Sequence, residues 1–238
     1  MKEKLKRYLM QEADIIPELE LWYKLDNFVS TAYVHDYSGN GITGAVREDA
    51  KPSYPGFVFN GLDEFIDTNN KFQSVFQDSF SISIWARGTA GTVFGGDAGD
   101  GAFEDGISIK LSTNTLSAVF KANGDEVTAT ENADSFPNAN VYRHIIATFE
   151  ADTQIRLYVN AVEQTLSVGG DGDASGVTFA DYGKTVVPPE LYIGAINADG
   201  NDDGHFAGNI ADFRIYSKLL SAVEVKNIYE LTRWRYSV

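Results

Sequence analysis

The chain has 238 residues, no cysteine, and 34 acidic against 19 basic side chains, which gives a formal net charge of −15. This length suits one large all-β domain or two small ones, and the lack of cysteine excludes disulfides, thiol catalysis and a cysteine-based zinc site. A protein this acidic repels nucleic acid and anionic membranes, so we expect neither as a partner, whereas calcium and neutral glycans suit the charge.

The first predicted element is a short amphipathic helix over residues 3–16, which ends at Pro17. This helix either packs on its own domain or docks elsewhere, and we expect residues 1–18 to be a docking segment ahead of a sandwich over residues 19–238. No apolar stretch of about 7–15 residues follows the basic start, so no secretory signal is predicted. No window reaches the roughly 20 apolar residues of a membrane span, so we expect no membrane insertion.

From residue 19 the pattern changes to the alternation of β-strands. In SFSISIWAR the side chains of Phe80, Ile82 and Ile84 share one face, which predicts a half-buried strand. Residues 115–130 predict a hairpin, because Asn123-Gly124 supplies the positive φ angles of a tight turn. Further strands are predicted over residues 141–150, 154–160 and 206–216.

Many aromatic and β-branched residues, with turn signals throughout, indicate antiparallel strands packed in two sheets. Two Gly/Asp-rich stretches, residues 95–106 and 169–176, are predicted to be loops within one domain. Near the C-terminus, Ser221 and Glu224 have the spacing of a capping box, which predicts a short helix from about residue 222 to 231.

Five motifs occur in the order found in one family. They are LWYKLD with HDYSGNGITG, FNGLDEFI, FSISIWAR, YRHIIATFEADTQIRLYVNAVE, and the stretch from LYIGAI to NIY. Together they resemble the laminin-G-like family of concanavalin A-like lectin and glucanase domains over residues 19–231. The resemblance implies an all-β fold, a concanavalin A-like jelly-roll sandwich of two antiparallel sheets, here with a short helix at each end. Asn160-Ala161 and Tyr142 depart from the Asp-Gly turn and the tryptophan of the family pattern.

Catalysis is not expected. Glycan-cleaving members of the wider superfamily carry the pattern E-x-D-x-x-E on one strand, which places two carboxylates about 5–5.5 Å apart. This pattern is absent from the sequence, and the three histidines form no recognisable site. His144 falls inside a predicted strand and is interpreted as a packing residue.

The stretch NADGNDDGHF raises the question of a calcium loop, because Asp199, Asn201 and Asp203 have the spacing of one. The twelfth position, which should hold a bidentate glutamate, is Ile210, and the similar loop at Asp171 has Tyr182 there. We therefore interpret both stretches as rim loops that contact a ligand, with Tyr182 stacking on a sugar ring. The candidate ligand-binding residues are Asp171, Asp173, Tyr182, Asp199, Asn201, Asp203 and His205.

A structural calcium is implied by the resemblance at a different place, between the first turn and the last long strand. The matching acids are Asp36 and Asp212, with backbone oxygens near Asn40 and Gly41 as further ligands. The alternative is that Asp36 forms only an Asx turn and Asp212 only hydrogen-bonds within the sandwich.

The sequence thus predicts a non-catalytic recognition module that binds a glycan or a surface protein through rim loops. We expect it on a virion, such as that of a phage, or on another extracellular surface, as an oligomer or a component of a larger assembly. The alternative is a purely structural decoration protein that is anchored by its N-terminal helix.

Overall fold

The computed structural model describes residues 18–26, 32–98, 105–136, 138–170 and 176–236. The helix expected over residues 3–16, and with it the docking segment up to residue 17, lies outside these ranges, as do Asp171 and Asp173. Within the described ranges, no helix has both the length and the apolar character needed to cross a bilayer.

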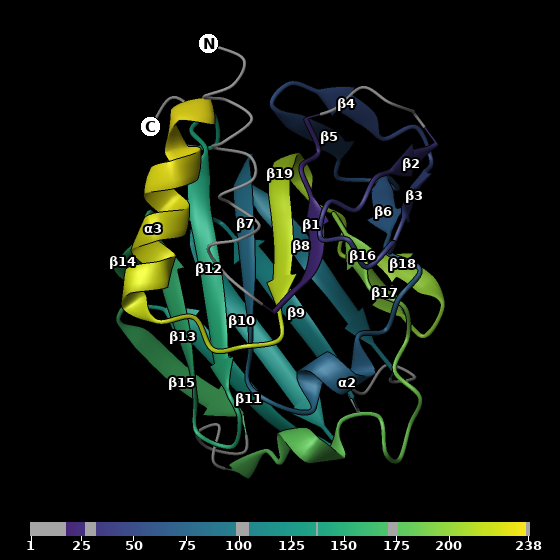
Figure 1. Ribbon diagram of the computed structural model, residues 1–238, viewed down its shortest axis with the longest axis vertical. Coiled ribbons are helices and arrows are strands. Elements are labelled where there is room, and N and C mark those ends of the chain that lie inside the picture. The colour runs from purple at the N-terminus through teal and green to yellow at the C-terminus, as the bar shows by residue number, and fades with distance from the viewer. Residues whose placement is uncertain (1–17, 27–31, 99–104, 137, 171–175, 237–238) are drawn as a thin grey trace.

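The strands form two layers that face each other (Figure 1). The front layer, sheet A, has eight strands. In spatial order they are β14 (Val162–Glu163), β13 (Gln154–Val159), β12 (Arg143–Glu150), β7 (Phe80–Gly88), β19 (Ala207–Tyr216), β5 (Gly56–Asn60) and β4 (Lys51–Ser53), with β1 (Leu19–Tyr23) also paired to β19. The jelly-roll sandwich expected from the sequence is confirmed.

The rear layer, sheet B, has eleven strands. In order they are β15 (Leu166–Gly170), β11 (Asp125–Glu131), β10 (Thr115–Ala122), β9 (Gly106–Ser112), β8 (Ala90–Asp97), β16 (Tyr192–Ile193), β6 (Phe65–Asp67), β3 (Gly44–Arg47) and β2 (Tyr33–Val34), with β17 (Ile196–Ala198) beside β8 and β18 (Asn201–Asp203) beside β17. Among the pairings of described strands, only that of β17 with β8 is parallel.

The main core fills the space between the sheets. Phe80 of β7 stacks on Phe149 of β12 at 4.4 Å between ring centroids, and Phe120 of β10 lies 4.1 Å from Phe179. Residues that alternate along each strand point into this layer, as Leu116, Ala118 and Phe120 do on β10, while their neighbours in sequence are half-buried. The period-2 pattern of the sequence is therefore the pattern of side chains that enter the core.

Tight turns join consecutive strands where the sequence supplies residues that accept a positive φ. Asn123 and Gly124, at φ 53° and 91°, close the predicted hairpin between β10 and β11. Asn160 and Ala161 also have positive φ values, of 50° and 63°. The departure from the family's Asp-Gly turn is therefore accommodated with a left-handed alanine, a conformation that is costly for a residue with a Cβ.

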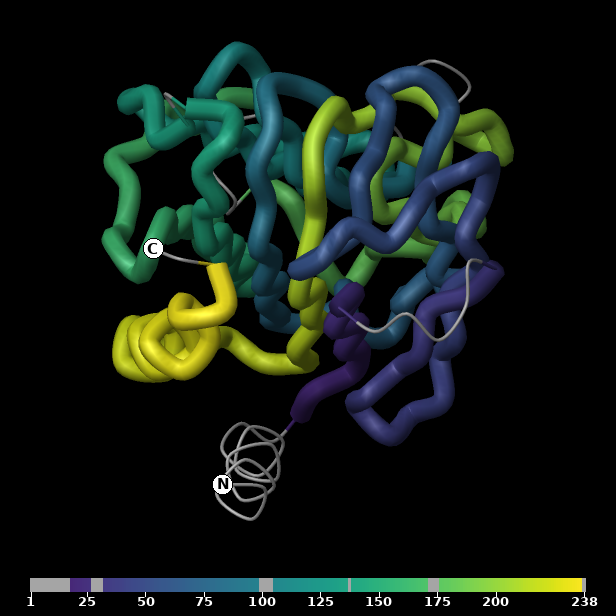
Figure 2. The backbone as a smooth tube through the Cα atoms, turned by 90° about the horizontal axis from the view of Figure 1, so that it is seen from above, coloured from purple at the N-terminus to yellow at the C-terminus, as the bar shows by residue number. Residues whose placement is uncertain are grey.

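A C-terminal helix, α3 (Ala222–Thr232), covers the outer face of sheet A; seen from above in Figure 2 it lies outside the two layers. The Ser221 side chain accepts a hydrogen bond from the Glu224 backbone, and the Glu224 side chain accepts one from the Ser221 backbone, so the predicted capping box is confirmed. Val225 and Ile228 of the helix are buried against Tyr216 of β19. A 3-10 turn, η3 (Arg233–Arg235), follows the helix and leads to Tyr236, which stacks on Trp85 of β7 at 4.2 Å.

This cover corrects one expectation. The alternation in SFSISIWAR predicts a strand with one exposed face, but both faces of β7 are buried. Phe80, Ile82 and Ile84 enter the core between the sheets, as expected. Ser81, Ser83 and Trp85 point outward and are buried in their turn, because the α3 region packs on that side: Trp85 Nε1 donates to Thr232 Oγ1 at 2.9 Å.

His144 of β12 is buried under the same cover. Its ring stacks on Trp85 at 4.9 Å between centroids, and its Nε2 lies 2.9 Å from Ser83 Oγ. Burial lowers the pKa of His144 from 6.5 to about 3, and the nearby Asp212 carboxylate only partly opposes this. The expectation that His144 is a packing residue is confirmed.

The protonation of His144 predicts a pH dependence of stability. Below pH 6.5 the unfolded chain takes up a proton at His144 that the folded chain does not bind until about pH 3. The free energy of unfolding should therefore decrease as the pH is lowered from 6.5 towards 3, by about 1.4 kcal/mol per pH unit from this residue alone. Urea denaturation at a series of pH values should show a steeper decline for the natural protein than for His144→Gln, which has no group at this position that titrates in this range. Equal slopes would contradict the assignment.

Candidate functional site

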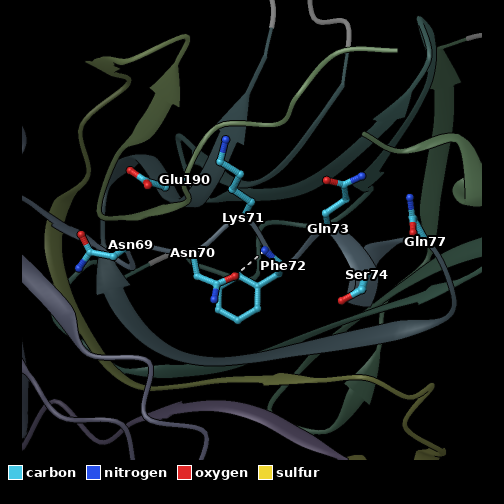
Figure 3. A pocket seen from close by; sticks show the side chains of 8 residues that line it. All are labelled: Asn69, Asn70, Lys71, Phe72, Gln73, Ser74, Gln77 and Glu190. Atoms are coloured by element: carbon cyan, nitrogen blue, oxygen red, sulfur yellow. Dashed lines mark hydrogen bonds between the residues drawn. The ribbon is translucent and has the colours of Figure 1, made fainter. Parts of the chain in front are cut away.

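An open groove with a volume of about 580 Å³ lies at the rim of the sandwich, beside the one-turn helix α2 (Gln73–Phe76). Figure 3 shows the side chains around it, most of which are polar. They are Asn69, Asn70, Lys71, Phe72, Gln73, Ser74, Gln77 and Glu190.

The loop that leads from β6 into α2 is held by its own side chains. Asp67 Oδ1 accepts from the Asn69 backbone at 2.8 Å, and Asn70 Oδ1 accepts from the Phe72 backbone at 2.7 Å. Asn69 and Phe72 have left-handed backbones, with φ 53° and 48°. Because Asx turns fix this path, the polar side chains between residues 69 and 74 are presented at the rim in a defined order.

Two glutamine side chains form one wall of the groove. Gln73 and Gln77 are four residues apart and so share one face of the α2 region. Gln73 Nε2 donates to the Gly183 carbonyl at 3.1 Å, and Gln77 Nε2 donates to the Tyr182 carbonyl at 2.7 Å. Both amides are therefore fixed in orientation before any ligand arrives.

Gly183 makes this arrangement sterically feasible. A Cβ at this position would lie 2.4 Å from Gln73 Cδ and 2.5 Å from Gln73 Nε2. Its φ of +74° is also in the left-handed region that favours glycine. The close approach of the two segments thus depends on a glycine opposite Gln73.

Several polar groups of the groove are left for a ligand. Within the described part of the chain, the Oε1 atoms of Gln73 and Gln77 accept no hydrogen bond, and the Lys71 ammonium and the Glu190 carboxylate have no partner. These groups include donors and acceptors, and the one cation is balanced by one anion. This combination suits a neutral ligand with many hydroxyl groups, since each hydroxyl both donates and accepts.

The stretch NADGNDDG, predicted to be a rim loop, forms a hairpin of two short strands, β17 and β18. Its turn consists of Asp199 and Gly200, at φ 50° and 88°. Asn201 and Asp203 lie on the returning strand: Asn201 Nδ2 donates to the Ala198 carbonyl, and Asp203 Oδ1 accepts from the Gly204 backbone. A two-residue turn of this kind does not wrap its side chains around an ion, which agrees with the incomplete calcium spacing in the sequence.

The hairpin and the groove are neighbours. Asn197 of β17 donates from Nδ2 to the backbone carbonyl of Glu190 at 2.7 Å. His205 follows the hairpin with a side chain that is only 11% exposed, and its Nε2 lies 3.1 Å from Asp202 Oδ2. His205, one of the candidate ligand-binding residues, is therefore engaged with Asp202 of the hairpin.

Tyr182 was expected to stack on a sugar ring, and this expectation is wrong. The side chain is fully buried, with its ring 5.5 Å from Phe120 and 5.7 Å from Phe76. Burial raises the pKa of its hydroxyl far above the usual value. The glycines and aspartates around it indicate a loop, but the loop folds inward and uses Tyr182 to close the core at this end.

Asp36, the first predicted calcium ligand, forms an Asx turn. Its Oδ1 accepts from the backbones of Trp22 and Ser38 at 3.1 and 2.8 Å. Its Oδ2 accepts from Ser38 Oγ at 2.8 Å and from the Ile42 backbone at 3.1 Å. Four donors thus occupy the lone pairs that a cation would need.

Asp212, the second predicted ligand, forms a buried ion pair. Its Oδ1 accepts from Arg214 Nε at 2.7 Å and from Trp22 Nε1 at 2.8 Å, and its Oδ2 accepts from Arg214 Nη2 at 3.0 Å. Although burial raises the pKa of Asp212, the charge and hydrogen bonds of Arg214 outweigh this effect and hold it below its usual value. A second cation, Arg235, lies 3.6 Å from Oδ2.

The other two predicted ligands are also engaged. Asn40 Nδ2 donates to the carbonyls of Leu19 and Glu20, and the Gly41 carbonyl accepts from the Thr43 backbone. In the described ranges no three histidine or acidic side chains gather as a metal site would require. The donor set at Asp36 and Asp212 therefore does not fit calcium, because N–H groups and two arginines fill the positions of a cation.

Sequence reasoning missed the residues of the groove. The sequence NNKFQSVFQ, immediately after a buried strand, contains four amide side chains within nine residues. That density of amides was the available signal. Aspartate and glycine are typical of turns, so the other loops carry the stronger turn signal.

Residues 59–226, more than half of the chain, match the family model Laminin_G_3, described as the concanavalin A-like lectin/glucanases superfamily. No curated protein matches the chain in sequence.

Solved structures of botulinum neurotoxin binding domains have a similar fold. The receptor-binding domain of the C/D mosaic serotype has a TM-score of 0.65 at 14% identity, over 90% of this chain and 51% of that one. The binding domain of neurotoxin DC, in complex with rat synaptotagmin II, has a TM-score of 0.63 at 18% identity, over 90% and 51%. Type C, described as interacting with two ganglioside molecules, has a TM-score of 0.63 at 17% identity, over 92% and 52%. The chain thus spans about half the length of these proteins, and at such low identity the likeness shows the fold alone.

The ion pair at Asp212 predicts how the protein responds to calcium. We expect the same melting temperature in calcium and in EDTA, because no coordination site is vacated by the chelator. Asp212→Asn should destabilise the protein by about 3–5 kcal/mol, since the buried ion pair with Arg214 is then broken. Differential scanning calorimetry measures both effects, with Asp199→Asn in the exposed turn as the control. A rise in melting temperature with calcium that is lost in Asp36→Asn would contradict this reading.

Proposed function

The chain belongs to the Laminin_G_3 family of the concanavalin A-like lectin/glucanase superfamily, and on this premise we propose that it is a non-catalytic recognition module that binds a neutral glycan in the groove beside α2. The ligand lies between the wall of glutamines and the Asn69–Asn70 turn. Its hydroxyl groups exchange hydrogen bonds with side-chain amides.

One observation carries the proposal: the amides of Gln73 and Gln77 are anchored through Nε2 to backbone carbonyls and leave their Oε1 atoms without a described donor. A side chain that is already fixed loses little conformational entropy when a ligand binds, so more of the interaction energy is retained as affinity. The groove is lined by one cation, Lys71, and one anion, Glu190, so it carries no net charge for an ionic ligand to recognise.

Two further observations support a binding role. The superfamily description includes lectins. Among the structural neighbours, neurotoxin type C is described as interacting with two ganglioside molecules, and the binding domain of neurotoxin DC was solved in complex with rat synaptotagmin II. A glycan and a protein receptor are therefore both precedented as partners of a chain with this fold. The glycan is favoured because the donors and acceptors that line the groove can exchange hydrogen bonds with hydroxyl groups.

The non-catalytic character of the proposal rests on the acids that the fold presents. A glycosidase needs two carboxylates about 5–10 Å apart with a sugar between them. The groove is lined by a single acid, Glu190, and the E-x-D-x-x-E pattern is absent from the sequence. We therefore expect no release of reducing sugars from β-glucans.

The setting of the module is part of the same proposal. A recognition module of this kind acts on an external surface, and we place it on a virion or another extracellular surface, as an oligomer or a component of a larger assembly. The segment of residues 1–18 is the proposed point of attachment. The competing function, a structural decoration protein, would need no ligand in the groove.

A glycan array tests the proposed function. We expect the purified protein to bind a restricted set of neutral glycans, equally with and without calcium. Gln73→Ala should weaken binding of the best glycan roughly fivefold, because one hydrogen bond contributes about 1 kcal/mol. Calorimetry with that glycan measures the change.

Gln154→Ala is the matched control, since Gln154 also donates from Nε2, here to Glu150, but lies on β13 of sheet A and does not line the groove. It should bind like the natural protein. A blank array from a protein that assembles into stable oligomers would contradict the glycan proposal and support the structural role. Equal losses in Gln73→Ala and Gln154→Ala would place the ligand elsewhere.

A further inference from the structure

A second cluster of polar side chains lies on the outer face of sheet A, at the margin of the part covered by the α3 region, where the Tyr142 ring lies 5.2 Å from that of Tyr236. Arg87 is near the end of β7, Asn209 is near the start of β19, and Tyr142 immediately precedes β12. The register pairs Asn209 with Arg87, and it places Tyr142 opposite Arg87 because the next pair along is Arg143 with Ala86. The three residues are therefore lateral neighbours on one face of the sheet.

Arg87 is held in place by its two neighbours. Its Nε donates to Asn209 Oδ1 at 3.1 Å, and its guanidinium carbon lies 4.9 Å from the centroid of the Tyr142 ring. No described residue accepts a hydrogen bond from either Nη atom, and no described carboxylate forms an ion pair with Arg87. A half-buried arginine that has fixed geometry, free Nη groups and no counter-charge is unusual, because arginine in such places is normally paired.

The neighbours of Arg87 contribute further unused donors. The side chain of Asn209 is 8% exposed and that of Tyr142 is 4% exposed. Asn209 Nδ2 and the Tyr142 hydroxyl are buried without a hydrogen-bond partner among the described residues. Burial raises the pKa of Tyr142 to about 12, against the opposing charge of Arg87, so the hydroxyl keeps its proton and remains a donor. Buried polar groups without partners are rare, and each one calls for an explanation.

The same row of the sheet continues with more positive charge. Val58 of β5 pairs with Asn209, and Lys51 of β4 pairs with Val58. Lys51 is exposed and has no ion-pair partner in the described part of the chain. The protein has a net charge of −15, yet Arg87 and Lys51 lie in one row of this face without a carboxylate partner among the described residues. This row is therefore locally positive on an acidic protein.

From this geometry we propose that Arg87, Asn209 and Tyr142 form a binding site for an oxyanion, either a carboxylate or a sulfate group. The Nη atoms of Arg87 supply the two-pronged donor that matches such a group, and Asn209 Nδ2 and the Tyr142 hydroxyl complete its hydrogen bonds. Lys51 attracts further negative charge along the row. The site is independent of the groove beside α2, which is neutral and is lined by none of these residues.

Calorimetric titration with three monosaccharides at constant ionic strength tests this site. We expect glucuronate or glucose 6-sulfate to bind and uncharged glucose not to bind here, and the tighter of the two acids identifies the preferred oxyanion. Arg87→Lys keeps the charge but loses the planar fork, and it should weaken binding roughly tenfold. Tyr142→Phe removes only the hydroxyl and should weaken binding roughly threefold to tenfold.

Two control variants keep the test specific. Arg156→Lys changes another arginine of sheet A, whose guanidinium lies near Glu150 and Glu163, and it should leave binding unchanged. Gln73→Ala alters the groove and should have no effect on the acids, which separates this site from the proposed glycan site. Failure of both acids to bind, binding of glucose that Arg87→Lys weakens as much as that of the acids, or full affinity for the acids in Tyr142→Phe would overturn the proposal. Tyr142→Phe is decisive even if Arg87→Lys does not fold.

Discussion

The carboxylate of Asp212 is the charge on which the arrangement of sheet A depends. Up to Ile210, β19 has β5 as its neighbour on one side, and from Phe213 onward it has β1. Asp212 lies between these two stretches at φ 44°, where the register with β7 also shifts. A bulge therefore marks the point at which one edge partner replaces another, and the buried pair with Arg214 stabilises it.

Trp22 connects this bulge to the first turn of the sandwich. Its indole donates to Asp212, and its backbone donates to Asp36, which in turn holds Ser38 and Ile42. Arg214 also lies over the Trp22 ring, at 4.4 Å. Trp22 thus links Asp36 and Asp212, the two acids that the family resemblance pairs as calcium ligands, through one hydrogen bond to each.

Sequence reasoning succeeded where a signal is local. Alternation placed Phe80, Ile82 and Ile84 in the core, Asn123-Gly124 gave the hairpin, and Ser221 with Glu224 gave the start of α3. It failed where the environment is created by distant segments. Tyr182 sits in a loop composition typical of exposed turns, yet Phe76 and Phe120, remote in sequence, enclose it. The groove beside α2 likewise depends on contacts between Gln73 and Gly183, which are 110 residues apart and which no local pattern encodes.

The central place of β19 has a consequence for how the chain acquires its structure. Its partners β1, β5 and β7 all precede it by well over a hundred residues, so sheet A cannot be completed through local contacts. Closing such large loops costs conformational entropy before any stabilising contact between the strands has formed. Proteins rich in non-local pairings fold slowly for this reason. During synthesis, β5 and β7 emerge early and keep open edges until residues 207–216 arrive between them. These edges are the part of the molecule that is most exposed to wrong strand pairing while the protein is being made.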